Sequence, residues 1–134
     1  MHSFTWNDNH SLGLPEIDAE HRALFRMAEE LHDAIGKGSA QDRLDGLLER
    51  LASYASFHFE TEEDLMRRTG FPDYAQHLRE HESFAGRISY LQTLNRNGSA
   101  DVPETLMDFL RGWIEQHTCG EDHRMVEHIK RVQC

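Results

Sequence analysis

The sequence predicts an all-α protein that folds as an up-down-up-down four-helix bundle with an N-terminal arm and a short C-terminal helical tail. Four long stretches carry apolar residues at spacings that alternate between three and four, the pattern of a helix with one buried face. Short turns separate the stretches, so consecutive helices are expected to be antiparallel neighbours. No stretch alternates with a period of two, and we therefore expect no sheet.

The helices are expected at residues 15–35, 40–68, 73–94 and 103–120. Pro15 suits a first helical turn, and Gly36 with Gly38 follows the first apolar pattern as a stop signal. Residues 69–72 break the second pattern, and residues 95–100 form a turn before the fourth. A chain of 134 residues is long enough to bury one core, so residues 1–134 are expected to form a single domain.

The two ends of the chain have different patterns. Residues 1–15 lack a sustained period, but they include Phe4 and Trp6, so we expect an ordered arm that packs its aromatic rings on the bundle. Residues 125–129 are amphipathic and either continue the fourth helix or restart after it.

Composition and charge exclude several classes of partner. The formal net charge is −10 and no cluster of lysine or arginine stands out, which argues against binding to nucleic acid or to an anionic membrane surface. Neither a signal peptide nor a run of 18 apolar residues is visible, so we expect no membrane insertion and a cytoplasmic location. Two cysteines, Cys119 and Cys134, are too few for a disulfide framework. The ten histidines are the unusual feature.

The buried face of every predicted helix contains residues that can bind a metal ion. In the second helix, His58 and Glu62 are four residues apart and occupy positions where the apolar pattern predicts leucine. An unpaired buried carboxylate is strongly destabilising, so Glu62 needs a positively charged partner in the core. The same pattern in all four helices yields six candidates, namely His21, His58, Glu62, His77, His81 and His117.

Each candidate alone has an ordinary explanation, because a single histidine on an apolar face is more often a hydrogen-bonded core residue than a ligand. The combination of all six has no such ordinary explanation. Five buried imidazoles and a carboxylate that satisfied only one another would be an unfavourable way to build a small core. We therefore predict a metal site inside the bundle.

Asp122 is a further candidate that a regular helix would not place in this site. It lies five residues after His117, an offset of roughly 140° around an α-helix. Gly120 lies between the two and permits a local break or a π-like turn that would bring both onto one face. Without such a turn, Asp122 would be a surface acid.

The number of candidates predicts two metal ions, because five imidazoles and two carboxylates exceed the donors of one tetrahedral zinc site. If both carboxylates bridge and a solvent-derived oxygen is shared, a metal with three histidines has six donors and a metal with two histidines has five. The second metal then keeps a free position for a small molecule. The spacing does not identify the metal, since the affinity order of divalent ions does not favour iron.

The order of the motifs along the chain resembles the hemerythrin family and, in a chain this short, its stand-alone bacteriohemerythrins. A histidine, then HxxxE, HxxxH and HxxxxD, follow one another on four helices after a tryptophan in the arm, and the match covers essentially the whole chain. The resemblance implies a non-haem di-iron centre that binds O2 reversibly, and hence an oxygen carrier, store or deliverer rather than an enzyme. It assigns His77, His81 and His117 to one iron, His21 and His58 to the other, and Glu62 and Asp122 to bridging positions.

By the same resemblance, O2 binds end-on at the five-coordinate iron. The pocket around this free coordination position is expected to be apolar. The residues positioned to line it are Leu24, Phe59, Trp113 and Ile114. Cys119, two residues after a ligand position, departs from the family motif. It is either inert or makes the site sensitive to oxidation.

Two other functions remain open. One is a di-iron enzyme that activates O2, reduces peroxide or handles nitric oxide, and the other is an O2 or redox sensor that acts on an unidentified protein partner. Ferritin-like di-iron oxygenases use more carboxylates and a Glu-x-x-His spacing, whereas imidazoles dominate here, which favours binding over catalysis. No attached output domain is visible, which weakens the sensor hypothesis.

Overall fold

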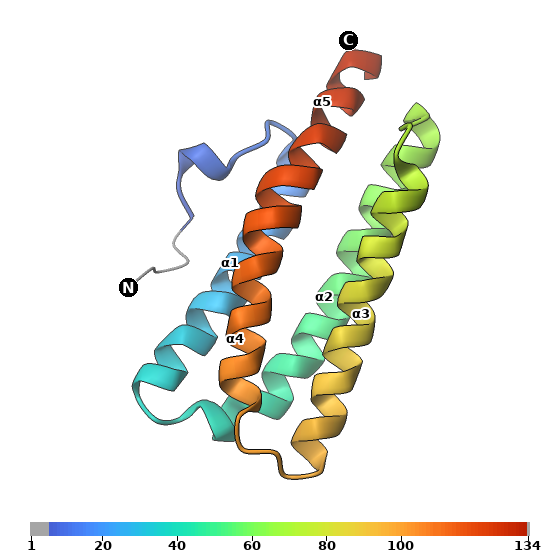
Figure 1. Cartoon of the computed structure of the whole chain (residues 1–134). Coiled ribbons are helices and arrows are strands. Elements are labelled where there is room, and N and C mark those ends of the chain that lie inside the picture. The colour runs from blue at the N-terminus through green and yellow to red at the C-terminus, as the bar shows by residue number, and fades with distance from the viewer. Residues whose placement is uncertain (1–5, 134) are drawn as a thin grey trace.

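The computed structural model describes residues 6–133, and these are helical except at short turns (Figure 1). The long helices are α1 (Pro15–Gly36), α2 (Ala40–Thr69), α3 (Tyr74–Arg96), α4 (Val102–Trp113) and α5 (Asp122–Gln133). A 3-10 helix, Asp8–His10, precedes them, and a π-helix, Ile114–Glu121, lies between α4 and α5. No strand occurs within residues 6–133, which confirms the all-α prediction.

The helices form an antiparallel bundle. In Figure 1, α1 and α3 run in one direction, while α2 and α4 run in the other. The helix α2 packs against both α1 and α3, and α1 also packs against α4. Within the described part of the chain, no helix is both long enough and apolar enough to cross a bilayer.

The helix ends follow the local signals in the sequence. The helix α1 begins at Pro15, whose missing N–H is no loss in a first turn. The helix α2 ends at Gly70, which has a left-handed φ of 68° and donates its N–H to the backbone oxygen of Met66. The first three helices therefore begin and end within two residues of the predicted positions.

The C-terminal part of the bundle follows one of the two predicted alternatives. The helix α4, the π-helix and α5 follow one another without a break, so α5 continues the fourth helix and does not restart after it (Figure 1). Met125, Val126 and Ile129 of α5 are fully buried and pack against Ile17 and Met66. Burial of this apolar face explains why the helix continues, because tertiary packing supplies most of the stability of a helix.

The N-terminal arm packs on the bundle through Trp6. Its indole meets the ring of Phe25 edge to face, with the ring centroids 5.3 Å apart, and the guanidinium of Arg22 lies 5.1 Å from the indole centroid. Phe4, the other aromatic residue expected to pack there, lies outside the described residues. The arm is thus attached to α1 at the edge of the larger apolar cluster.

Two apolar clusters fill the bundle, and a polar layer separates them. The larger cluster includes Leu24 and Phe84, and the smaller one includes Ile17 and Met66. Along α1, the buried His21 lies between Ile17 of the smaller cluster and Leu24 of the larger one. The polar layer therefore occupies the interior of the bundle, and apolar side chains exclude water on both sides of it.

Candidate metal centre

All seven predicted ligand positions meet in this polar layer. None is more than 3% exposed, and they comprise His21 of α1, His58 and Glu62 of α2, His77 and His81 of α3, His117 of the π-helix and Asp122 of α5. Their donor atoms form two groups, each within a span of 4.8 Å. One contains His77, His81 and His117, here named the three-histidine set, and the other contains His21 and His58, the two-histidine set. Both groups include Glu62 and Asp122.

Glu62 directs one carboxylate oxygen toward each set. Its Oε1 lies 3.0 Å from Nε2 of His77 and 2.9 Å from Nε2 of His81. Its Oε2 lies 2.8 Å from Nε2 of His58. The carboxylate therefore spans the two sets, as a bridging ligand would.

Asp122, the first residue of α5, spans the two sets in the same way. Its Oδ1 lies 3.0 Å from Nε2 of His77 and 3.1 Å from Nε2 of His117. Its Oδ2 lies 3.0 Å from Nε2 of His21. Two carboxylates with this arrangement and five imidazole nitrogens enclose one small volume.

Several of these short contacts are not hydrogen bonds. Within the described residues, three buried atoms have no hydrogen-bond partner, namely Oε2 of Glu62, Oδ1 of Asp122 and Nε2 of His117. Each of the two oxygens nevertheless lies within 3.1 Å of an imidazole nitrogen. A buried polar atom left without a bond costs about 1–3 kcal/mol, and more if it is charged. The imidazole nitrogens and carboxylate oxygens thus point toward a shared space. Zinc and iron bind these two kinds of ligand atom in proteins. These residues fit a metal centre.

The π-helix brings Asp122 into the site. The N–H of Asp122 donates to the backbone oxygen of His117, five residues earlier, which is the bond of a π turn. The predicted π-like turn is confirmed, and its geometry does not require a glycine at position 120. Gly120 does not have a left-handed φ, and a Cβ built there would have the backbone oxygen of Glu115, 3.9 Å away, as its nearest described neighbour. An alanine would fit at this position.

In the metal-free protein, protonated imidazoles balance the buried carboxylates. Burial lowers the pKa of His58, but the charge of Glu62 and the hydrogen bond to Glu20 outweigh it and raise the pKa to about 10. The same competition between burial and the nearby carboxylates raises the pKa of His77 to about 9 and of His117 to about 11. Burial opposes ionisation of Glu62, yet the neighbouring imidazoles hold the pKa of its carboxyl well below the usual range. Positive charge is therefore required at this place in the core.

Metal binding is expected to release protons, because an imidazole must be deprotonated to coordinate. At pH 7, groups with pKa values of about 9 to 11 are protonated, so anaerobic addition of Fe²⁺ should release up to three protons per chain, one each from His58, His77 and His117. A pH indicator in weakly buffered solution measures the release. The apparent affinity for Fe²⁺ should rise as the pH is raised toward 9, since fewer protons then compete. The exposed His123 serves as the control, because His123→Ala should release as many protons as the wild type.

Three further carboxylates, which the sequence analysis missed, hold imidazoles from behind. In each case Nδ1 of the histidine donates to a glutamate oxygen, and the pairs are His58 with Glu20 at 2.5 Å, His81 with Glu63 at 2.9 Å, and His117 with Glu80 at 2.6 Å. A proton held on Nδ1 leaves the lone pair on Nε2 facing the centre and makes that nitrogen a stronger donor. Each glutamate is adjacent in sequence to a predicted ligand but bonds to a histidine of the next helix. That adjacency is the signal that could have identified them.

Two of the four residues expected around the free coordination position are aliphatic and buried. Leu24, three residues after His21 on α1, is 0% exposed, and Ile114, three residues before His117, is 5% exposed. Both belong to the larger apolar cluster. They lie at the same level of the bundle, because α1 and α4 run in opposite directions.

The other two, Phe59 and Trp113, stack on imidazoles. The ring of Phe59 lies parallel to that of His81 with centroids 3.9 Å apart, and the indole of Trp113 lies over His117 at 4.0 Å. Both aromatic residues therefore fix the orientation of the three-histidine set.

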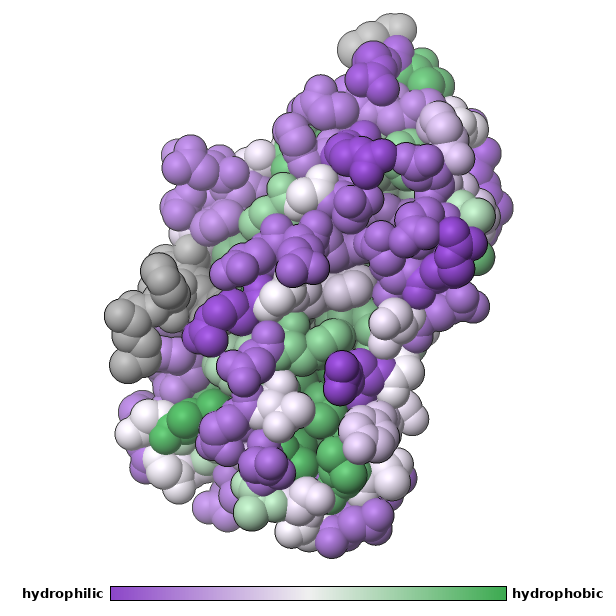
Figure 2. Space-filling model, in the orientation of Figure 1, coloured by the Kyte–Doolittle hydropathy of each residue, from purple (hydrophilic) through white to green (hydrophobic). Residues whose placement is uncertain are grey.

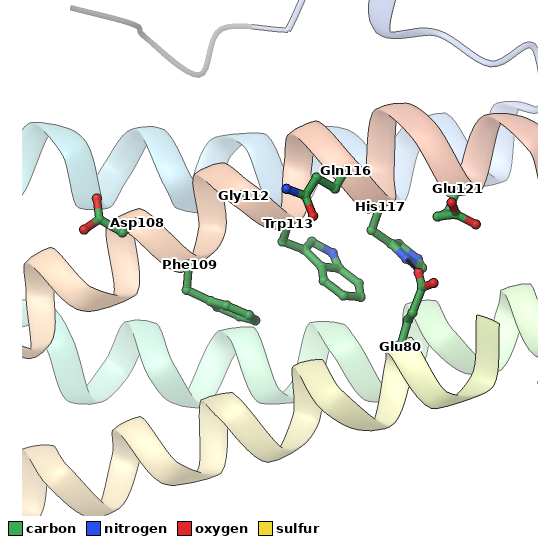
Figure 3. Close-up of a pocket in the computed structure, with 8 residues that line it drawn as sticks. All are labelled: Glu80, Asp108, Phe109, Gly112, Trp113, Gln116, His117 and Glu121. Carbon is green, nitrogen blue, oxygen red and sulfur yellow. Dashed lines mark hydrogen bonds and ion pairs between the residues drawn. The ribbon is translucent and has the colours of Figure 1, made fainter. Parts of the chain in front are cut away.

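A surface pocket of about 480 Å³ between α3 and α4 reaches the back of this set. Figure 3 shows the carboxylate of Glu80 extending to the imidazole of His117, with Trp113 and Phe109 along the same wall. On the face shown in Figure 2, apolar residues gather over the lower part of the bundle, whereas its upper part is hydrophilic. The surface pocket therefore reaches His117 on the side where Glu80 accepts its Nδ1–H.

Cys119 lies outside the centre. Its side chain is exposed, and partial burial together with the negative charges of Asp122 and Glu115 raises the pKa of the thiol. A raised pKa leaves less of the reactive thiolate at neutral pH, which favours the inert interpretation. Cys134 lies outside the described residues.

Comparison with known proteins gives a consistent result. The hemerythrin HHE cation-binding domain model matches residues 12–129. The chain is 29% identical over 128 residues to a bacteriohemerythrin of Clostridium acetobutylicum, covering 92% of this chain and 99% of that protein. It is 32% identical over 100 residues to a bacteriohemerythrin of Methylococcus capsulatus, covering 75% and 76% of the two chains. A crystal structure of wild-type hemerythrin matches with a TM-score of 0.82 at 28% identity, covering 93% of this chain and 96% of the other. The chain therefore belongs to the hemerythrin family, a family of non-haem iron proteins.

Proposed function

We propose that this protein binds O2 reversibly at a centre of two non-haem iron ions, as an oxygen carrier, store or deliverer. The three-histidine set would hold one ion and the two-histidine set the other, with Glu62 and Asp122 as bridging ligands. The observation that carries the proposal is the orientation of the two carboxylates, each of which directs one oxygen to each set over 2.8 to 3.1 Å.

The unequal division of the imidazoles supports a centre with one free position. With both carboxylates and a shared solvent-derived oxygen, one ion would have six donors and the other five. Iron supplies the electrons that reversible binding of O2 requires. The protein's own part is to hold the ions at a fixed separation and to exclude water.

The apolar residues next to the polar layer support the exclusion of water. Leu24 and Ile114 have no polar side-chain atoms, and together with the larger apolar cluster they keep solvent from the layer that contains His21 and His58. A site closed to water is protected from proton leakage and from side reactions of a bound ligand.

The donor balance favours binding over catalysis. Five neutral imidazoles and two bridging carboxylates place less negative charge on the ions than the carboxylate-rich sites of ferritin-like oxygenases. Less anionic charge gives less stabilisation of highly oxidised iron, which an oxygen-activating enzyme needs.

The test is reconstitution with Fe²⁺ under anaerobic conditions, followed by titration with O2. We expect two iron ions per chain and an optical spectrum that returns to the deoxy form when O2 is removed, over repeated cycles. Steady consumption of O2 with release of hydrogen peroxide would contradict the proposal and identify an enzyme.

Ile114→Ala is expected to accelerate autoxidation of the oxygenated protein, because the smaller side chain admits water beside the two-histidine set. The rate of loss of the oxygenated spectrum measures the effect. Ile129→Ala is the matched control, since Ile129 is also buried but belongs to the smaller apolar cluster on the other side of the centre. Equal rates in the two variants would remove Ile114 from the lining of the site.

We further propose that residues 1–134 act as one domain, because the centre takes ligands from α1, α2, α3, the π-helix and α5, which together extend along most of the chain. The cytoplasmic location and the exclusion of nucleic acid as a partner stay predictions from composition.

A further inference from the structure

The polar side chain of Tyr54 lies beside the two-histidine set. It lies on α2 one turn before His58, and its ring stacks on that imidazole with centroids 5.2 Å apart and an interplanar angle of 16°. Tyr54 is therefore placed next to the half of the centre for which the proposed function requires a free coordination position.

The direction of the helices puts Tyr54 at the level of the expected ligand pocket. The helices α1 and α2 are antiparallel, so a residue one turn after His21 and a residue one turn before His58 lie on the same side of the centre. Leu24 and Ile114 occupy this level, and Tyr54 packs against the apolar cluster to which both belong. A phenol hydroxyl is thus present where the sequence predicted only apolar atoms.

The hydroxyl of Tyr54 lacks a partner. Its oxygen is buried and makes no hydrogen bond with any of residues 6–133. A buried hydroxyl without a bond is unfavourable, and tyrosine hydroxyls in protein interiors usually find a partner. The atoms without partners on Glu62, Asp122 and His117 face the proposed ions, but a neutral phenol is not among the expected ligands.

This hydroxyl is available as a donor. A phenol is protonated at neutral pH, so its O–H can donate a hydrogen bond. The ring contact with His58 places it beside the two-histidine set.

We propose that the Tyr54 hydroxyl donates a hydrogen bond to a small ligand held at the free position of the two-histidine ion, and so favours ligands that carry negative charge. This inference rests on the proposed function, because it requires that position to exist. It goes beyond that function by assigning a specificity-determining residue on α2 and a class of ligand, O2 and small anions such as azide.

Azide binding to the iron-loaded, oxidised protein tests the inference with Tyr54→Phe, which keeps the stacked ring and removes only the hydroxyl. Tyr90→Phe is the matched control, since Tyr90 is 55% exposed on α3. We expect Tyr54→Phe to retain its iron and its thermal stability but to bind azide about tenfold more weakly, the effect of one hydrogen bond to a charged acceptor. The infrared stretch of bound azide should shift between H2O and D2O in the wild type and in Tyr90→Phe, and not in Tyr54→Phe.

Unchanged azide affinity and an unchanged isotope shift in Tyr54→Phe would overturn the inference and leave the proposed function intact. Loss of iron from Tyr54→Phe would also overturn it, because the residue would then be structural. A wild-type protein that holds iron but binds neither azide nor O2 would overturn the proposed function itself, and this inference with it.

Discussion

Glu62→Ala is expected to lose most of its bound iron, while Glu60→Ala keeps the wild-type amount. Glu62 is 0% exposed and approaches imidazoles of both sets, so its removal takes a donor from each ion at once. Glu60 is exposed two residues earlier on the same helix, and its replacement removes an equal charge from the surface. Iron per chain after reconstitution and desalting measures the difference.

The same pair of variants should differ in the stability of the metal-free protein. Glu62 balances protonated imidazoles in the core, and removal of one partner of a buried ion pair costs about 3–5 kcal/mol. Glu60→Ala should stay within about 0.5 kcal/mol of the wild type, as surface substitutions usually do. Urea unfolding of the metal-free proteins measures both values. If both variants retained two iron ions, the assignment of Glu62 as a bridging ligand would be wrong.

Glu80→Gln is expected to lower the affinity for iron about 10- to 100-fold, the usual effect of removing a group that orients a metal ligand. Oε1 of Glu80 accepts the Nδ1–H of His117 at 2.6 Å and thereby keeps the lone pair on Nε2 facing the centre. A glutamine has the same shape but no charge, and its amide can donate to Nδ1 and favour the wrong tautomer. The fold should be unchanged because no apolar contact is lost.

The matched control is Glu82→Gln, since Glu82 is exposed two residues further along α3. Competition with an iron chelator of known affinity measures the effect in both variants. Equal affinities for Glu80→Gln, Glu82→Gln and the wild type would show that another contact sets the tautomer of His117.

Helical periodicity explains why most of the site could be predicted without a structure. Residues four positions apart lie on one face of a helix, so the pairs His58 with Glu62 and His77 with His81 follow from local geometry. Short turns then bring the buried faces of consecutive helices together. Asp122 required a departure from the regular helix, and the predicted π turn is present.

The contacts between helices could not be predicted in the same way. Glu20 precedes His21 in sequence, but its carboxylate bonds to His58 on the next helix, and Glu80 reaches His117 in the same manner. Such contacts depend on the rotation and separation of neighbouring helices, which the spacing of residues along one helix does not specify. Whether residues 125–129 continue the fourth helix stayed open for the same reason, because the continuous helix depends on packing against Ile17 and Met66.

The helical class and the buried faces of the helices could be predicted from the chain alone, because the period of the apolar residues is a property of each segment. The same pattern also predicted imidazoles and carboxylates in the interior, in numbers suited to two ions. The fold was needed to show which oxygen of Glu62 and Asp122 faces which histidines and which glutamates hold the imidazoles. It was also needed to show that the hydroxyl of Tyr54 is buried without a partner among residues 6–133. Distances of about 3 Å between side chains of different helices depend on how the helices pack, and packing is a property of the whole bundle.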